Sequence, residues 1–355
     1  MPPSSVPSSS SLRVGLVGYG LAGRQFHAPL LAAAGLTVAA VSTSDRARAD
    51  AAREDLPQAR VVPDLDALLE AGGVDLVVLA SATGAHAAQA EQVIGAGLPL
   101  VVDKPLAVDA TAALAVVDLA AHHGVPLTVF QNRRYDREFL ALTAVRDEAL
   151  VGEVYRAEYR WDRWRPVPAP RWRQQVAPEE GGGILLDLHS HLLDQAVLLH
   201  GEVVTVYAEL ASHTTVSEDD TFLACRHASG VVTHVSASWV AGAPGPRARV
   251  SGSAGAFVVA GQAGEETAFR DFADEGDAVG WLVRGTERTP GPVVPPADPA
   301  DFYRGVAAAL ASDDPQPLMP VDPRDSVHVL AVIDAARTSA AGGRVVDVLT
   351  PGQPD

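Results

Sequence analysis

Two hydrophobic patterns alternate along the first 130 residues. Short runs of consecutive apolar residues are separated by longer, alanine-rich stretches with helical spacing. Runs of this kind are typical of strands that helices cover on both faces. Their repetition with helices predicts a doubly wound parallel sheet, as in a Rossmann domain. The predicted strands are 12–18, 36–42, 59–62, 75–81, 98–103 and 125–130.

After about residue 150 the apolar residues alternate with polar ones. VGEVYRAEYRWDRW (151–164) and VVTVYAEL (203–210) show this pattern, and residues 219–239 resemble a hairpin that turns at Ser229-Gly230. We predict a C-terminal α+β domain with a large, open, mostly antiparallel sheet and two final helices. Residues 262–298 are expected to be loop with short strands. The predicted organisation is a disordered tail over 1–11, a Rossmann domain over 12–131 and a substrate and oligomerisation domain over 132–355.

Composition excludes several function classes. The chain has 355 residues, of which 47% are hydrophobic and 20% charged, and its net charge of −17 argues against nucleic-acid binding. A single cysteine, Cys225, allows no intramolecular disulfide, and its strand-like surroundings predict a core position. There is no cysteine and histidine cluster at zinc spacing and no membrane-length apolar run, and the N-terminal segment is expected to be a disordered tail and not a signal peptide. We therefore expect a cytoplasmic protein without a metal site.

A glycine-rich sequence follows the first predicted strand and opens a helix. Gly18-Tyr19-Gly20-Leu21-Ala22-Gly23 fits G-x-G-x-x-G. In a strand–turn–helix setting, the first glycine allows the tight turn, the second lets a pyrophosphate approach the backbone, and the third lets helix and strand pack closely. The helix N-terminus favours the anion. All six residues are therefore predicted to contact a nicotinamide dinucleotide.

The end of the second predicted strand bears on the choice between NAD and NADP. An NAD site places an acidic residue there to hold the ribose 2′-hydroxyl, but this position is Thr43. Hydroxyl groups and a guanidinium suit a 2′-phosphate, so we predict NADP over NAD, bound by Ser42, Thr43, Ser44 and Arg46. The alternative is that Asp45 holds the ribose and Arg46 is a solvated residue.

The fifth predicted strand ends in Val101-Val102-Asp103-Lys104-Pro105. Acid–Lys–Pro at this position, after G-x-G-x-x-G, resembles the Gfo/Idh/MocA oxidoreductase family. The resemblance extends over about residues 12–345 and is closest to the branch of NADP-dependent scyllo-inositol dehydrogenases. Further matching segments are FHAPLL (26–31), QNRRYDREFL (131–140), DRWRP (162–166), RWR (171–173) and LDLHSHLLDQA (186–196).

The resemblance implies particular site residues. The catalytic lysine of the family falls on Lys104, and its Asp-x-x-x-His pair falls on Asp187 and His191. Family members are commonly dimers or tetramers, so a homo-oligomer is expected. Where the family often has Thr-Pro-Asn, this chain has Ala82-Thr83-Gly84, a departure in a loop that the resemblance places against the cofactor. Further cofactor contacts are expected from Ser81, Thr83, His86, Asp103 and Lys104.

Four charged or titratable residues interrupt the leucine-rich segment 181–197. On a helix, Asp187, His191 and Asp194 lie on nearly one face, whereas His189 points away. A carboxylate beside an imidazole fixes its tautomer. Our hypothesis is that His191 accepts a hydroxyl proton, Asp187 orients it or binds a neighbouring hydroxyl, and Lys104 stabilises the reacting oxygen. His191 and Lys104 can exchange these roles, and the alternative is a solvated polar face. Asp194 and His189 are expected to be structural.

Two further segments supply candidate substrate contacts. Asn132 and Arg133 follow the sixth predicted strand, at the edge where open α/β sheets bind ligands. The segment from Arg156 to Arg173 is rich in arginine and tryptophan; Arg163 and Trp164 are the residues expected nearest the site. It is either a loop over the substrate or an Arg–Trp stacked strand edge or subunit contact.

These features predict an NADP-dependent dehydrogenase that acts on a secondary alcohol or ketone of a cyclic polyol or sugar, with scyllo-inositol as the first candidate. One alternative is another sugar reductase or a biliverdin-type reductase. A second is a non-catalytic NADP-binding sensor on the same fold, since a fold does not fix a function.

Overall fold

The computed structural model describes residues 12–168, 172–261 and 269–352. The predicted tail over 1–11 and part of the predicted loop over 262–298 lie outside this range. The described chain forms two compact units. The first contains the residues up to Asp103, Leu119–Thr128 and Ala300–Pro320; the second contains Lys104–Asp118, Val129–Pro299 and the residues from Val321 onward.

Residues 300–320 were predicted to belong to the C-terminal domain, but they cluster with the first unit. Phe302 and Tyr303 are completely buried, and the Tyr303 hydroxyl lies 2.5 Å from Nδ1 of His27. The hydrophobic pattern shows that this helix is half buried, but it does not show which core receives its apolar side.

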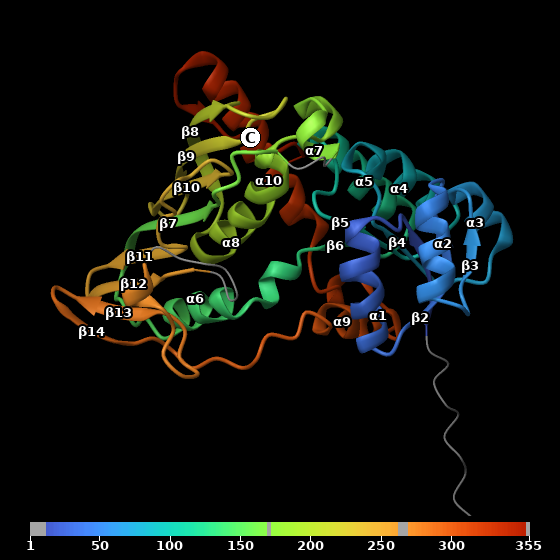
Figure 1. Cartoon of the computed structure of the whole chain (residues 1–355), viewed down its shortest axis with the longest axis horizontal. Helices are drawn as coiled ribbons and strands as arrows, with labels where there is room; N and C mark the ends of the chain where they lie inside the picture. Colours follow the sequence, from blue (N-terminus) through green and yellow to red (C-terminus); the bar gives the residue numbers. More distant parts are fainter. Residues whose placement is uncertain (1–11, 169–171, 262–268, 353–355) are drawn as a thin grey trace, which may run out of the picture. The chain divides into compact units, whose positions relative to one another are not determined.

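The first sheet has six strands in the order β3-β2-β1-β4-β5-β6, as the apolar runs predicted (Figure 1). Pairing from β3 through β5 is parallel. Strand order reverses between β1 and β4, the place where open α/β sheets bind ligands. The strands are β1 (Arg13–Val17), β2 (Thr37–Ser42), β3 (Arg60–Val62), β4 (Leu76–Leu79), β5 (Leu100–Asp103) and β6 (Leu127–Phe130).

Helices separate these strands along the chain. The carboxylates of Asp45 and Asp64 cap α2 and α3 by accepting a backbone N–H three residues on, which satisfies a donor that the helix leaves open. Nowhere in the described residues is a helix long and apolar enough to cross a membrane. The elements are η1 (Gly23–His27), α1 (Ala28–Ala33), α2 (Arg46–Asp55), α3 (Leu65–Ala71), η2 (Thr83–Ala85), α4 (His86–Gly95), α5 (Ala110–His123), α9 (Asp301–Leu310) and η7 (Gln316–Leu318).

The second sheet is open and has nine strands, in the order β14-β13-β12-β11-β7-β10-β9-β8-β15. Only the pair β10 and β7 is parallel among the pairs formed by the described residues, which confirms a mostly antiparallel sheet. The strands are β7 (Val154–Asp162), β8 (Val203–Ala211), β9 (Asp220–His227), β10 (Val232–Ser238), β11 (Ala248–Gly252), β12 (Gly255–Val259), β13 (Trp281–Arg284), β14 (Glu287–Pro290) and β15 (Val346–Asp347).

Helices cover one face of this sheet. Burial alternates along β9 and β10, and α8 and α10 contact the sheet (Figure 1). The hairpin turn lies at Ser229-Gly230, where Gly230 has a φ of +89°, and Cys225 is buried, both as predicted. The remaining elements are η3 (Asn132–Tyr135), α6 (Arg137–Asp147), α7 (Trp172–Gln175), η4 (Pro178–Glu180), η5 (Leu185–His189), α8 (Ser190–His200), η6 (Arg270–Phe272) and α10 (Pro323–Gly342).

The leucine-rich segment differs in detail from the uniform α-helix that its sequence predicts. It starts as a π-helical turn, η5, and continues as α8. A π turn closes hydrogen bonds to the fifth residue instead of the fourth, so the α-helical offset between Asp187 and His191 does not apply. Such turns occur frequently at functional sites.

Candidate functional site

The glycine-rich loop of the first unit has the shape of a phosphate cradle. Gly18 has a φ of +95°, and a Cβ there would lie 2.6 Å from the carbonyl oxygen of Ala80. A Cβ on Gly23 would lie 2.0 Å from the carbonyl oxygen of Gly18. At Gly20, by contrast, a Cβ would meet only the guanidinium of Arg48, at 3.7 Å. The loop therefore leaves open space at the position where a dinucleotide phosphate approaches the backbone.

The end of β2 places a second arginine near this loop. Asp45 is committed to capping α2, because its Oδ1 accepts the N–H of Arg48 at 2.9 Å. Both Arg46 and Arg48 are exposed, and the side chain of Arg48 lies against Gly20. Arg48 is a candidate phosphate contact that the sequence did not identify, because its approach to Gly20 depends on the rotation of α2. Ser42 is buried, Thr43 is half-buried and Ser44 is exposed.

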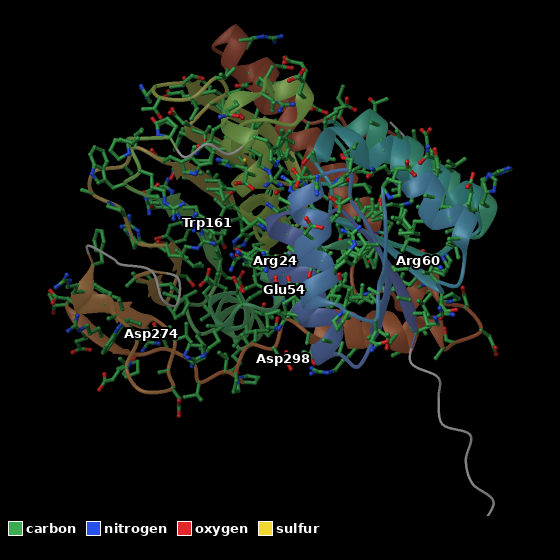
Figure 2. The ribbon with its side chains drawn as sticks, turned by 45° about the vertical axis from the view of Figure 1, so that its right-hand side comes forward. Arg24, Glu54, Arg60, Trp161, Asp274 and Asp298 are labelled. Atoms are coloured by element: carbon green, nitrogen blue, oxygen red, sulfur yellow. The ribbon has the colours of Figure 1, made fainter. Side chains whose placement is uncertain are left out.

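The buried tyrosine of the loop is tied to the end of α2. The Tyr19 hydroxyl donates to Asp55 Oδ2 at 3.2 Å, and Arg24 donates to the same carboxylate at 2.6 and 3.1 Å. Figure 2 shows Arg24 and Glu54, the neighbour of Asp55. The hydrogen bond from Arg24 lowers the pKa of Asp55, and burial, aided by Asp55, raises the pKa of Tyr19 to about 12. Tyr19 therefore supports the loop and stays protonated.

The polar residues that follow β4 form a small network. Ser81 Oγ donates to Gln89 Oε1 at 2.6 Å, and His86 Nε2 lies 3.2 Å from the carbonyl oxygen of Ser81. The buried hydroxyl of Thr83 has no hydrogen-bond partner within the described parts of the chain. A buried orphan hydroxyl calls for a ligand or water. Thr83 is therefore the residue of this loop that best fits a cofactor contact.

Asp103, the last residue of β5, lies in a buried polar group. His27 Nε2 is 3.8 Å from Asp103 Oδ1, and His27 Nδ1 is 2.5 Å from the hydroxyl of Tyr303. Burial, together with the charge of Asp103, raises the pKa of Tyr303 well above its ordinary value. His27, from FHAPLL, and Asp103, from the acid–Lys–Pro sequence, thus lie close together in the first unit. Neither sequence segment alone predicts this contact.

The second unit contains the predicted catalytic residues in one cluster. Lys104 Nζ donates to the carbonyl oxygen of Asp187 at 2.5 Å and to its Oδ1 at 3.2 Å. Arg173 Nε lies 3.7 Å from the same Oδ1. Burial alone would raise the pKa of Asp187, but these two cations outweigh it and lower the pKa to about 2. Asp187 is therefore ionised throughout the physiological range.

The ring of His191 has a defined tautomer. Gln131 Nε2 donates to the carbonyl oxygen of Ser190 at 3.2 Å, which turns Gln131 Oε1 toward His191 Nδ1, also at 3.2 Å. Because an amide oxygen only accepts, Nδ1 carries the proton and Nε2 keeps its lone pair. Burial, with the charge of Lys104 and neighbouring arginines, holds the pKa of His191 well below its ordinary value. The imidazole is neutral and can accept a proton at Nε2.

Among the described contacts, Asp187 accepts no hydrogen bond from His191, which it was expected to orient. Asp187 instead contacts Lys104, and Gln131 occupies the orienting position. The ammonium of Lys104 occupies the Asp187 carboxylate, and the helix pitch changes between Asp187 in η5 and His191 in α8. Gln131 was missed because glutamine at a strand end is compatible with many roles. The only signal was its place at the carboxyl end of the sixth strand.

Trp161 (labelled in Figure 2) is surrounded by cations. The guanidinium carbons of Arg133, Arg163 and Arg247 lie 5.1, 5.3 and 4.3 Å from its ring centroid. The His191 ring is also close, at 5.9 Å between centroids. β7, which carries Trp161, lies between β11 and β10, so the strand-edge alternative for this segment was wrong.

The loop that follows β7 lines a cavity of about 220 Å³. Arg163 lines it, whereas Trp164 does not; Trp164 is 60% exposed and packs near Gly242. Asn132 lies in η3, and Arg133 is paired with Asp136 at 2.9 Å. The lining residues are Arg163, Arg165, Pro166, Val167, Gln174, Asp187 and Trp239.

Asp194 and His189 are both buried and both have partners within the protein, which fits the structural roles expected of them. Arg134 binds both carboxylate oxygens of Asp194, at 2.9 and 2.6 Å, and Asp325 at 2.8 Å. His189 Nε2 lies 2.8 Å from the Thr221 hydroxyl, and burial lowers the pKa of His189 to about 3.

Comparison with known proteins identifies the relatives of both parts of the chain. Residues 12–131 match the oxidoreductase family with an NAD-binding Rossmann fold, and residues 139–258 match the GFO/IDH/MocA C-terminal domain. The uncharacterized oxidoreductase YdgJ of Escherichia coli K12 is 34% identical over 345 residues, covering 94% of this chain and 97% of its own. The scyllo-inositol 2-dehydrogenase (NADP(+)) IolW of Bacillus subtilis is 27% identical, covering 95% and 96%.

Solved structures give the same result. The oxidoreductase YPO2259 of Yersinia pestis superposes with a TM-score of 0.82 at 30% identity, covering 97% of this chain and 99% of its own. The oxidoreductase yvaA of Bacillus subtilis gives a TM-score of 0.82 at 25% identity, covering 97% and 100%.

Proposed function

Because the chain belongs to the Gfo/Idh/MocA family of oxidoreductases, we propose that it is an NADP-dependent dehydrogenase of cyclic polyols or sugars. It oxidises a secondary hydroxyl to a ketone or runs the reverse reduction. The observation that carries the proposal is that an ammonium, a carboxylate and a neutral imidazole, from Lys104, Asp187 and His191, gather in one cluster of the second unit.

The cofactor is held by residues of the first unit. The loop from Gly18 to Gly23 receives the pyrophosphate, and Thr43, Arg46 and Arg48 hold the 2′-phosphate. Thr83 supplies its unpaired hydroxyl to the same ligand. When bound, the nicotinamide supplies the acceptor for the hydride that leaves the carbinol carbon.

The chain's own residues handle the proton. His191 Nε2 accepts the hydroxyl proton, since its Nδ1–H is held by Gln131. Lys104, positioned by the carbonyl and carboxylate of Asp187, donates a hydrogen bond to the reacting oxygen and stabilises its developing negative charge. The opposite assignment makes Lys104 the proton acceptor. That assignment predicts that a His191 variant keeps the fall in activity at low pH, because protonation of Lys104 causes it. Our assignment predicts that the variant loses this fall, because protonation of the imidazole causes it.

Cofactor preference tests the first-unit assignment. An Arg46→Gln/Arg48→Gln variant should lower the ratio of kcat/KM with NADP to that with NAD by about 10- to 100-fold, because charge-assisted contacts to the 2′-phosphate are lost. Thr43→Asp should shift the preference in the same direction. Arg53→Gln, near the exposed C-terminal end of α2, is the control. An unchanged ratio in both variants contradicts NADP selection at this site.

Turnover tests the reaction. We expect polyols and sugars to generate absorbance of the reduced nicotinamide, and scyllo-inositol is the first compound to assay because IolW is named for it. Activity confined to carbonyl reduction would favour the other sugar reductases or biliverdin-type reductases. NADP binding without turnover on any member of the panel would favour a non-catalytic sensor.

We also propose that the protein forms a homodimer or homotetramer, since the second unit contains a nine-stranded open sheet with helices on one face. Light scattering after size-exclusion chromatography measures the mass directly. A monomer at micromolar concentration contradicts this part of the proposal.

A further inference from the structure

Gln174 lies on α7, a short helix that neighbouring segments hold in place. On one side, the backbone N–H of Val216, in the loop between β8 and β9, donates to the carbonyl oxygen of Gln174 at 3.2 Å. On the other side, the N–H of Gly183 donates to the carbonyl oxygen of Arg173 at 3.0 Å. Gly183 comes shortly before η5, which carries Asp187. Backbone hydrogen bonds therefore fix the helix of Gln174 beside the segment that leads to Asp187.

The amide oxygen of Gln174 is an unpaired acceptor. Gln174 lines the cavity of about 220 Å³, and its Oε1 is buried with no hydrogen-bond partner among residues 12–168, 172–261 and 269–352. A buried acceptor that stays unpaired costs free energy, so such atoms are usually completed by a ligand or by water. The terminal torsion of glutamine has a broad profile, so a small rotation turns Oε1 toward a molecule in the cavity. Because an amide oxygen only accepts, that molecule must supply a donor.

Asp187 adds a second acceptor to the lining of the same cavity. Lys104 Nζ and Arg173 Nε both approach its Oδ1, at 3.2 and 3.7 Å, and no described residue donates a hydrogen bond to its Oδ2. The carboxylate is ionised, so Oδ2 also only accepts. Arg163 and Arg165 line the cavity too, and each has interactions within the chain. The cavity therefore offers a ligand two acceptors, from two different segments.

We propose that Gln174 binds the substrate and selects for a free hydroxyl. Its Oε1 accepts a hydrogen bond from one hydroxyl of the polyol, while Asp187 Oδ2 accepts one from another. This rests on the proposed dehydrogenase function and narrows its substrates to polyols and sugars that present a donor at both positions. A deoxy compound leaves Oε1 unpaired, and fluorine or a methoxy group there places one acceptor against another. Trp239 and Pro166 supply the apolar part of the lining against which the carbon ring packs.

Deoxy and fluoro analogues of one sugar test the proposal. D-Glucose is the probe because its hydroxyls are chemically distinct, whereas those of scyllo-inositol are equivalent by symmetry. With the full chain and NADP, kcat/KM is measured for D-glucose, its 2-, 3- and 4-deoxy forms and the corresponding deoxyfluoro compounds. We expect loss of the hydroxyl at one ring position or more to lower kcat/KM by about tenfold, and fluorine at that position to lower it at least as much. Equal values for all compounds overturn the proposal and leave the dehydrogenase function in place.

Variants assign the effect to Gln174. Gln174→Leu removes the acceptor, so kcat/KM for D-glucose should fall by about tenfold, while that for the deoxy compound lacking the hydroxyl that Gln174 binds should stay unchanged. Discrimination at this position should then disappear, whereas Gln174→Glu, which keeps an acceptor, should preserve it. Gln175→Leu, at an exposed neighbour on the same helix, is the matched control and should behave as the parent. If Gln174→Leu lowers kcat/KM equally for every compound, or for none, Gln174 does not bind a hydroxyl and the proposal is wrong.

Binding without turnover separates this proposal from the proposed function. Titration calorimetry in the presence of NADPH, which cannot accept a hydride, measures the affinity for D-glucose, its deoxy forms and scyllo-inositol. If D-glucose binds more tightly than one deoxy form to the parent but equally to Gln174→Leu, the hydroxyl site is supported even when no compound is oxidised. The dehydrogenase function then fails alone. No binding of D-glucose or scyllo-inositol at millimolar concentration overturns the proposal, as does binding that Gln174→Leu leaves unchanged.

Discussion

Two carboxylates on the same leucine-rich segment, Asp187 and Asp194, have opposite surroundings. Both oxygens of Asp194 are bound by Arg134, which also binds Asp325, and the Asp194 side chain is only 2% exposed. Asp187 is 25% exposed, contacts Lys104 and Arg173, and itself lines a cavity. The first arrangement is closed and the second is open to a ligand.

The difference shows how to separate structural from functional charges. When charged side chains satisfy all of one another's hydrogen bonds, they hold two segments together, and no donor or acceptor remains to bind a substrate. An incomplete arrangement is costly to bury unless another molecule completes it. The sequence places both acids in one apolar segment, and only their partners show which one belongs to the candidate site.

The largest expected effect is on catalysis, in the cluster that contains Asp187 and His191. His191→Asn removes the proton acceptor, and we expect kcat to fall by about 10²- to 10⁴-fold, the range that general base catalysis supplies. Steady-state kinetics at saturating NADP measures the change, with circular dichroism to show that the variant is folded. Near-normal turnover would remove His191 from the mechanism.

The second effect is on stability, at the ion pair between Asp194 and Arg134. Asp194→Asn leaves the buried guanidinium of Arg134 partly uncompensated, and the free energy of unfolding should decrease by about 3–5 kcal/mol. Urea denaturation measures this change. Asp325→Asn is the matched control, since Asp325 is 34% exposed and binds the same arginine through one contact. If Asp194→Asn is as stable as the parent but inactive, Asp194 belongs to the site and the comparison fails.

Much of the fold was predictable because it depends on local patterns. The six parallel strands follow from continuous apolar runs, and the hairpin follows from alternation on either side of Ser229-Gly230. The placement of residues 300–320 was not predictable, because a helix with one apolar face fits either core. The π turn was equally hidden, since the spacing of leucines is compatible with both helix types.

The candidate site was predictable in its residue types and less so in its contacts. Lys104, Asp187 and His191 were identified from motifs and lie together. The contact between Gln131 and His191 was not foreseen, because it joins elements 60 residues apart. Arg48 was missed for the same reason: its approach to Gly20 is a property of the packed helix.

A smaller effect concerns the ionisation of Asp187. Its pKa is lowered to about 2, so its charge stabilises the native state above pH 4, and this contribution is lost as the pH falls from about 4 to about 2. We expect Asp187→Asn to be less stable than the parent by about 2 kcal/mol at pH 7 and equally stable near pH 2. Urea denaturation across this range tests the sign. A difference that grows on acidification would show that Asp187 is protonated more readily in the folded state.

The smallest expected effect concerns Gln131, a positioning residue. Gln131→Leu removes the acceptor for Nδ1–H of His191, a neutral hydrogen bond of about 1 kcal/mol, so kcat should fall by up to about tenfold. A purely structural role would lower stability without moving the pH profile. If Gln131 fixes the tautomer of His191, its loss should instead alter the pH at which protonation of His191 lowers activity. Gln131→Glu keeps an acceptor and adds a negative charge, so it should restore most of kcat and move this fall in activity to higher pH. If neither variant changes the pH dependence caused by His191, Gln131 does not act through His191, and another group must orient the imidazole.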